Sequence, residues 1–209
     1  MKAYDELQKK IQNRYKEVKI KYKSDYLFWQ MLPEGLRCSG CVLGNTIWMP
    51  ARTYNLSVLA HEYVHVVQQH TLGKLMFVLL YIMPQVLSFL FFITAIGLAL
   101  FSLGTAALIV AALGLIPLGP WPAKKRLELE VEGYTMNLAV ERWKNGKNSK
   151  QLQKFIVDSL IGWLYYKMTW NRAEVNKLVL DMVLKVSEGS SDLMNNIAYK
   201  DTYETIHNG

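Results

Sequence analysis

Hydrophobic positions at the start of the chain repeat with helical spacing. Between Ala3 and Val18, apolar residues recur mostly every four positions, and lysine and arginine fill many of the positions between them. Such spacing predicts an amphipathic helix of about 20 residues with a basic outer face. Two short segments with the pattern of extended chain follow, at residues 37–42 and 46–49, separated by a Leu-Gly-Asn turn. They predict a small β-hairpin.

A long apolar segment fills the middle of the chain, and no charged residue occurs between Leu75 and Ala123. A helix crosses the bilayer core with about 20 apolar residues, so residues 75–119 are long enough for two spans. We expect the turn between the spans at Gly97 or within residues 102–105. Two core helices of a soluble protein, or a hairpin that enters only one leaflet, are the alternatives.

Helical patterns return after the apolar segment. Residues 127–143, 150–170 and 173–186 each carry apolar residues at helical spacing. After a break at residues 189–191, the polar tail is expected to be partly ordered. The sequence therefore predicts a mainly α fold with a small β-hairpin and an inserted apolar helical hairpin.

The charge of the chain favours an anionic partner. Lysine and arginine total 24 against 17 aspartates and glutamates, which gives a formal net charge of +7. Residues 1–23 hold much of this excess, and a basic stretch attracts nucleic acid and anionic lipid headgroups equally by charge. The chain lacks the aromatic-spaced pattern of a nucleic-acid module. We therefore expect a lipid bilayer with anionic headgroups, and no nucleic acid, as partner.

The flanking charges predict on which side of the membrane the polar parts lie. Lys74 precedes the apolar segment, and residues 124–126 follow it as Lys-Lys-Arg. By the positive-inside tendency, both ends face the cytoplasm. The charged N-terminus lacks the apolar core of a secretory signal peptide, and Cys38 and Cys41 are too few for a disulfide framework. We expect a membrane protein whose polar domain stays on the cytoplasmic side, with both cysteines reduced.

The strongest chemical signal is the stretch His61-Glu62-Tyr63-Val64-His65. It lies in a predicted helix with an N-cap at Ser57 and an end near Gly73. The four-residue spacing puts both imidazoles on one helical face, where two nitrogens can bind one zinc ion. Glu62 is turned off that axis and can reach the open side of the metal. The motif predicts a Zn²⁺ site with His61 and His65 as ligands and Glu62 as general base.

A catalytic zinc site needs a third protein ligand. The positions where another zinc-peptidase type continues with glycine and histidine hold Gln68 and Thr71, so a carboxylate from another helix is expected. The helix after the apolar segment offers Glu128, Glu130 and Glu132. Glu130 lies at the edge of the apolar stripe of that helix and can point inward. We predict Glu130 as the ligand, with Glu128 and Glu132 as alternatives.

These residues resemble the gluzincin metallopeptidases. The match consists of a short strand at residues 46–49, the segment Leu59–His65 and a later helix with Glu130. The integral-membrane gluzincins, meaning the prenyl-protein endopeptidases and HtpX-like proteases, also place membrane helices between their two metal-binding helices. Their second motif has a small residue three positions after the glutamate and an acid at the fourth, where this chain has Gly133 and Tyr134. The resemblance implies a minimal zincin-like (minigluzincin) core with one membrane hairpin inserted.

The expected organisation has one metallopeptidase domain in two parts. Residues 1–74 and 120–209 would form this domain, and residues 75–119 would be the membrane hairpin inserted into it. Tyr134 would take the place of the acid that hydrogen-bonds a ligand histidine. Gln68, one turn beyond the second histidine, can hydrogen-bond near the site or cap the polar end of its helix.

The expected function is zinc-dependent endopeptidase activity at the membrane. Bound zinc would polarise the scissile carbonyl, and Glu62 would take a proton from the attacking water and return it to the leaving amine. A protein or peptide substrate is expected to add as a strand along residues 46–49. Tyr134, Tyr165 and Tyr166 are candidates for stabilising the oxyanion. The alternative function is a non-catalytic membrane-binding structural or delivery protein with a gluzincin-like scaffold.

Overall fold

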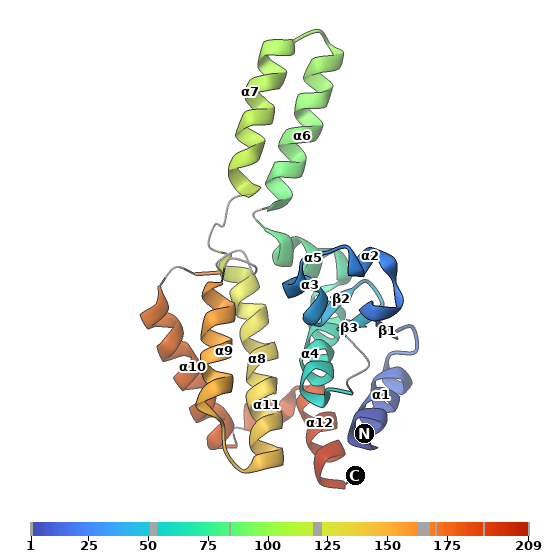
Figure 1. Ribbon diagram of the computed structural model, residues 1–209, viewed down its shortest axis with the longest axis vertical. Coiled ribbons are helices and arrows are strands. Elements are labelled where there is room, and N and C mark those ends of the chain that lie inside the picture. The colour runs from blue at the N-terminus through green and yellow to red at the C-terminus, as the bar shows by residue number, and fades with distance from the viewer. Residues whose placement is uncertain are drawn as a thin grey trace.

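The computed structural model of the chain describes residues 2–50, 54–83, 85–118, 123–162, 168–169, 171–189 and 191–208. Most of them are helical, and one small three-stranded sheet packs against a central helix (Figure 1), so the chain is mainly α, as predicted. In chain order the elements are α1 (Lys2–Arg14), β1 (Lys19–Tyr22), η1 (Lys23–Asp25), α2 (Leu27–Gln30), α3 (Glu34–Cys38), β2 (Cys41–Leu43), β3 (Thr46–Met49), α4 (Leu56–Leu72), α5 (Lys74–Ile82), α6 (Gln85–Leu100), α7 (Gly104–Leu115), η2 (Ile116–Leu118), α8 (Lys124–Asn145), α9 (Lys150–Ile161), α10 (Arg172–Ser187), α11 (Ser191–Asn195) and α12 (Ile197–Asn208).

The first helix is shorter than predicted. α1 buries Tyr4, Leu7 and Ile11 on one face and ends at Arg14. The prediction that it continues through Val18 toward about 20 residues was wrong, because β1 follows and pairs in parallel with β3. The Lys-Ile-Lys-Tyr sequence of β1 suits a half-buried strand, and pairing with a distant strand decides its conformation.

β3 is the central strand of the sheet, with β1 on one side and β2 on the other. β2 and β3 form the predicted antiparallel hairpin, with Gly44 at a φ of 57° in its turn. The extended chain begins at Cys41 and not at Arg37 as predicted, because α3 includes Arg37. The expectation that a substrate adds along Thr46–Met49 was also wrong, because β3 is paired on both sides, and among the described strands β1 and β2 are the edges.

α4 and α8 pack against each other at the centre of the body, meaning the described elements other than α6, α7 and η2 (Figure 1). The N-cap of α4 is Asn55 and not Ser57 as predicted. Asn55 Oδ1 accepts hydrogen bonds from the backbone N–H groups of Ser57 and Val58 at 3.0 and 3.2 Å. Asparagine is a strong cap because its carbonyl satisfies N–H groups that the first turn leaves free. The shift of the cap leaves the motif in the middle of the helix.

In its described residues, the apolar segment forms the α-helices α5, α6 and α7 and the short helix η2. α6 packs along α7, and these two helices with their connection, called the apolar pair below, project from one end of the body (Figure 1). The connection lies around Ser102, at a φ of 60°, which is the second of the two predicted positions, while Gly97 lies within α6. No single helix in the described part of the chain has the length and composition to cross a bilayer. α5 and α6 have them only together, and they meet at a bend of 92°.

The helices after α8 differ in part from prediction. α10 forms where it was predicted, but α9 ends at Ile161, so the prediction of a helix over residues 150–170 was too long. Residues 163–167 lie outside the described residues, and with them the candidates Tyr165 and Tyr166. The predicted polar tail contains α11 and α12, and α12 packs against α1, α4 and α8.

A buried carboxylate attaches α12 to the rest of the core. Asp201, which is 4% exposed, accepts hydrogen bonds from Tyr63 Oη on α4 at 2.7 Å and from Arg14 Nε on α1 at 3.1 Å. A buried charge needs such partners, and here the contact joins three helices. The polar composition of the tail concealed this packing from sequence analysis.

Candidate metal centre

Two histidines of α4 and one glutamate of α8 converge between the two helices. His61 Nε2 and His65 Nε2 lie 3.2 Å apart. Glu130 Oε2 lies 3.5 Å from His61 Nε2, and Glu130 Oε1 lies 3.7 Å from His65 Nε2. All three side chains are buried, and one donor atom from each lies within 4.8 Å of the others. The fold thus brings together the three residues that the sequence singled out as ligands.

The other two glutamates of α8 do not join this group. Glu128 is exposed and pairs with Lys125, with Nζ and Oε2 2.7 Å apart. Glu132 Oε2 accepts a hydrogen bond from Gln68 Nε2 at 2.8 Å. Residues two positions apart on a helix differ by about 200° around its axis, so Glu130 points away from the side that Glu128 and Glu132 share. Of the three glutamates, Glu130 is the one that faces the imidazoles.

Hydrogen bonds on the far ring nitrogens fix the orientation of both imidazoles. His61 Nδ1 donates to Asn137 Oδ1, and His65 Nδ1 donates to Gln68 Oε1, each at 2.8 Å. Both Nε2 atoms are thereby left facing Glu130, the arrangement by which ligand histidines are usually held. Gln68 thus takes the first of its two predicted roles, and it also donates to the carbonyl of Leu129 at 3.1 Å.

The partner of His61 is not the residue that the family pattern pointed to. Tyr134 was expected to take the place of the acid that accepts a hydrogen bond from a ligand histidine, but its ring packs edge-on against His61, with centroids 5.0 Å apart. Asn137, two turns beyond Glu130 on the same face of α8, takes the bond instead. The seven-residue spacing from Glu130 is the sequence signal that would have identified Asn137.

Glu62 lies beside this group and is 4% exposed. Its Oε2 atom has no hydrogen-bond partner among the described residues. Gly40, the residue before β2, lies so close that a Cβ there would overlap the Glu62 carboxylate, only 2.9 Å from its Cδ. Lys23 holds the segment before Gly40 in place, because Nζ donates to the carbonyls of Leu36 and Ser39 at 2.7 and 2.9 Å. No spacing in the sequence indicated that Gly40 is a neighbour of Glu62, and this contact brings the edge strand β2 to the carboxylate.

Burial and nearby charge shift the ionisation of the site. Burial raises the pKa of Glu62 to about 7, the range that suits a general base. Burial also opposes ionisation of Glu130, but hydrogen bonding to His61 and the charges of both imidazoles lower its pKa to about 2. Burial lowers the pKa of His65. For His61 the carboxylates of Glu130 and Glu62 outweigh burial and raise the pKa to about 9.

Gly133 leaves room for the first imidazole. A Cβ at this position would lie 2.7 Å from both Cε1 and Nε2 of His61. Gly133→Ala is therefore expected to displace the ring, to weaken metal binding and to destabilise the fold by about 1–3 kcal/mol, the usual cost of overpacking. Metal titration and denaturant unfolding measure both effects.

Gly104→Ala is the matched control for this prediction, because a Cβ at Gly104 meets no atom within 4 Å. It should leave metal affinity and stability close to those of the original chain. A Gly133→Ala protein that binds metal with unchanged affinity would show that His61 does not depend on this close approach.

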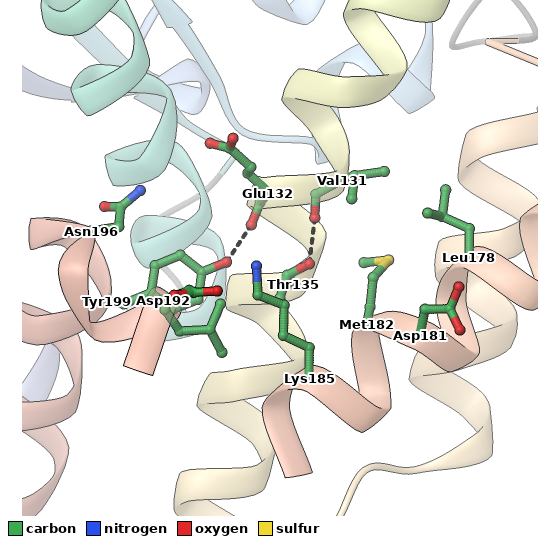
Figure 2. A pocket seen from close by; sticks show the side chains of 11 residues that line it. Val131, Glu132, Thr135, Leu178, Asp181, Met182, Lys185, Asp192, Asn196 and Tyr199 are labelled. Atoms are coloured by element: carbon green, nitrogen blue, oxygen red, sulfur yellow. Dashed lines mark hydrogen bonds between the residues drawn. The ribbon is translucent and has the colours of Figure 1, made fainter. Parts of the chain in front are cut away.

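A pocket of about 290 Å³ lies on the other side of α8. Figure 2 shows Glu132 and Thr135 of α8 at its wall, facing Met182 of α10 and Tyr199 of α12. Tyr199 Oη donates to the carbonyl of Glu132 at 2.7 Å, which ties α12 to α8 there. The pocket contains none of the three converging residues, so it is separate from the metal centre.

The donor set suits zinc. Two imidazole nitrogens and a carboxylate oxygen are a common ligand set for catalytic zinc, and ligands at 2.0–2.1 Å from a tetrahedral ion lie about 3.3 Å from one another. The separations of 3.2, 3.5 and 3.7 Å between the donor atoms are close to that value.

The family model described as Peptidase family M48 matches residues 52–198, which include α4, α8 and the apolar segment between them. No curated protein and no solved structure matches the chain. The chain belongs to Peptidase family M48 and is a zinc metallopeptidase of the HExxH gluzincin type, a family that includes HtpX-like members.

Proposed function

We propose that the chain is a membrane-associated zinc endopeptidase with a zincin-like core. His61, His65 and Glu130 hold the zinc, and Glu62 is the general base. The observation that carries this proposal is the convergence of the three donors beside a buried carboxylate that has an unpartnered oxygen among the described residues. The test is to measure zinc content and peptide cleavage in a Glu62→Gln protein, which should keep its zinc and lose cleavage.

The chemistry divides between the metal and the side chains. Bound zinc supplies a Lewis acid for the scissile carbonyl and makes water more acidic. Glu62 takes the proton of the attacking water and returns it to the leaving amine, and its raised pKa suits both transfers. Asn137 and Gln68 keep the two imidazoles turned toward Glu130 throughout, because they accept their Nδ1 protons.

The substrate backbone is proposed to pair with β2. This strand is hydrogen-bonded to β3 on one side only, so its other edge can accept an extended peptide. β2 starts next to Gly40, which lies against Glu62. A peptide strand along this edge would therefore lead its backbone past the catalytic carboxylate. Protein or peptide chains in extended conformation are the substrate class that fits.

The apolar pair is proposed to enter the membrane, as an insertion between the two metal-binding helices. Its exposed side chains are large and apolar, among them Leu100 at 79% and Phe101 at 80% exposure. The end of the body from which it projects also carries α2, where Leu27, Phe28 and the following Met31 are 73, 66 and 78% exposed (Figure 1). Apolar surface of this size favours contact with lipid.

Charges around the base of the apolar pair support the orientation. Lys74, Lys124 and Lys125 are exposed at the two ends of the apolar segment. Lysines in these positions favour the cytoplasmic side and anionic headgroups. We therefore place the part of the chain that holds the metal centre, α5 included, on the cytoplasmic face of the membrane, with the apolar pair as the inserted hairpin.

Charged substitutions on the apolar pair test the membrane contact. The chain is expected to float with anionic lipid vesicles in a density gradient. A double variant, Ile96→Lys with Leu108→Lys, should remain at the bottom, because each lysine costs about 2.5–3.5 kcal/mol in the bilayer core. Ile96 and Leu108 are 62 and 74% exposed, so neither change disturbs the core of the body.

Leu180→Lys on α10 is the matched control for flotation, because Leu180 is an exposed leucine of the body, at 54%. It should float as the original chain does. Equal flotation of the double variant would contradict insertion of the apolar pair.

A further inference from the structure

Tyr81, in the last turn of α5, reaches the proposed metal centre from the base of the apolar pair. Its hydroxyl donates a hydrogen bond to Glu130 Oε1. Its ring stacks on Phe77, with centroids 5.6 Å apart, and meets the ring of His65 edge-on at 5.9 Å. α5 thus adds a third helix to the donor group of α4 and α8, and Tyr81 is the hydrogen-bond donor that it brings there.

A buried arginine fixes the backbone of Tyr81 to α8. Arg126 Nε donates to the carbonyl of Tyr81, and its guanidinium lies 5.3 Å from the centroid of the Tyr81 ring. Arg126 Nη2 donates to Gln85 Oε1, at the start of α6, at 3.1 Å. Arg126 is 5% exposed, and a buried guanidinium is stable only with such partners.

Both contacts come from one face of α8. Arg126 and Glu130 are four residues apart, so they lie one turn from each other on the same side of the helix. One holds the carbonyl of Tyr81, and the other accepts the bond from its hydroxyl. The bend between α5 and α6 is thereby attached to α8 at Arg126, next to the carboxylate.

We propose that Tyr81 is a positioning residue for Glu130, and that Arg126 acts through Tyr81. The proposal rests on the proposed function, because it takes Glu130 as a zinc ligand. A carboxylate ligand can rotate about its side-chain bonds, and a hydrogen bond to one oxygen selects the rotamer that faces the imidazoles. Tyr81 supplies that bond from the element that leads into the apolar pair.

Zinc affinity of a Tyr81→Phe protein is the first test. The ring contacts with Phe77 and His65 remain, and only the hydroxyl is lost. Competition with a chromophoric chelator, on the full chain in detergent micelles, should show affinity lower by roughly 10–100-fold, the usual effect of removing a partner of a metal ligand. The absorption spectrum of the Co²⁺-loaded protein should also change, because the carboxylate is no longer held in one orientation.

Tyr199→Phe is the matched control. This change also removes a buried tyrosine hydroxyl that donates a hydrogen bond to α8, in this case to the carbonyl of Glu132 at 2.7 Å. That carbonyl is not one of the proposed zinc ligands. Its zinc affinity and Co²⁺ spectrum should equal those of the original chain. Equal losses in Tyr81→Phe and Tyr199→Phe would mean that Tyr81 acts only by stabilising the fold, which overturns the proposal.

A double-mutant cycle tests the role of Arg126. Arg126→Gln should weaken zinc binding in the original chain but add little in the Tyr81→Phe background, because residues that act through one another are not additive. Equal losses of zinc affinity in both backgrounds would overturn the action of Arg126 through Tyr81.

The outcomes also separate this proposal from the proposed function. A chain that binds no stoichiometric zinc refutes the proposed function, whereas normal zinc affinity in the Tyr81→Phe protein refutes only the positioning role.

Discussion

A Glu62→Gln protein is expected to lose roughly 10²–10⁴-fold in peptide hydrolysis while it binds zinc at the original ratio. Glutamine has the shape of glutamate but cannot take a proton from water, so the chemical step loses its base. None of the three converging donors is altered, and Asn137 and Gln68 still orient the imidazoles. Cleavage of an unfolded protein substrate, measured with metal content on the same sample, gives both values.

Glu174→Gln, on the exposed surface of α10, is the control, because it removes one surface carboxylate and should leave cleavage unchanged. The experiment also separates the two functions that the sequence left open. A delivery protein with a metallopeptidase scaffold would perform its cellular task equally well after the loss of the Glu62 carboxylate. Full cleavage activity in the Glu62→Gln protein would refute the assignment of the base.

Glu130→Gln is expected to weaken zinc binding by more than the roughly 10–100-fold that a partner of a ligand contributes. The change keeps the shape of the side chain and its burial but removes the negative charge that lies 3.5 and 3.7 Å from the two imidazole nitrogens. The loss should persist in the absence of any substrate, because it concerns the ligand itself. Isothermal titration or chelator competition measures it.

Glu128→Gln and Glu132→Gln are controls that the chain itself supplies. Glu128 pairs with Lys125 on the surface, so its replacement should have no effect on zinc. Glu132 accepts a hydrogen bond from Gln68, which orients His65, so its replacement should have a smaller effect than that of Glu130. A larger loss in either control than in Glu130→Gln would move the third ligand to that residue.

Local helix geometry explains which parts of the site could be predicted from the sequence. The four-residue spacing of His61 and His65 fixes their common face whatever the rest of the chain does. The apolar stripe of the later helix pointed Glu130 inward for the same reason, and the structure brings its carboxylate to the imidazoles. Each prediction needed only the periodicity of one element.

The features that were missed depend on contacts between distant elements. Asn137 reaches His61, Tyr81 reaches Glu130, and Gly40 touches Glu62 only because α4, α5, α8 and β2 pack in one arrangement. The same cause makes β3 a central strand, because its second neighbour, β1, lies just after the residues whose spacing predicted a helix. Periodicity along the chain contains no information about such neighbours.

The order of the elements along the chain also sets the timing of synthesis. The ribosome releases α4 first, then the apolar pair, then α8 with Glu130, and α12 last, whose Asp201 binds Tyr63 of α4. Two histidines alone bind zinc less tightly than a complete set of three ligands. A nascent chain therefore exposes its apolar helices before it has all three ligands of the zinc site. Because the apolar helices lie between α4 and α8 in the chain, the zinc site stays incomplete until α8 has been synthesised.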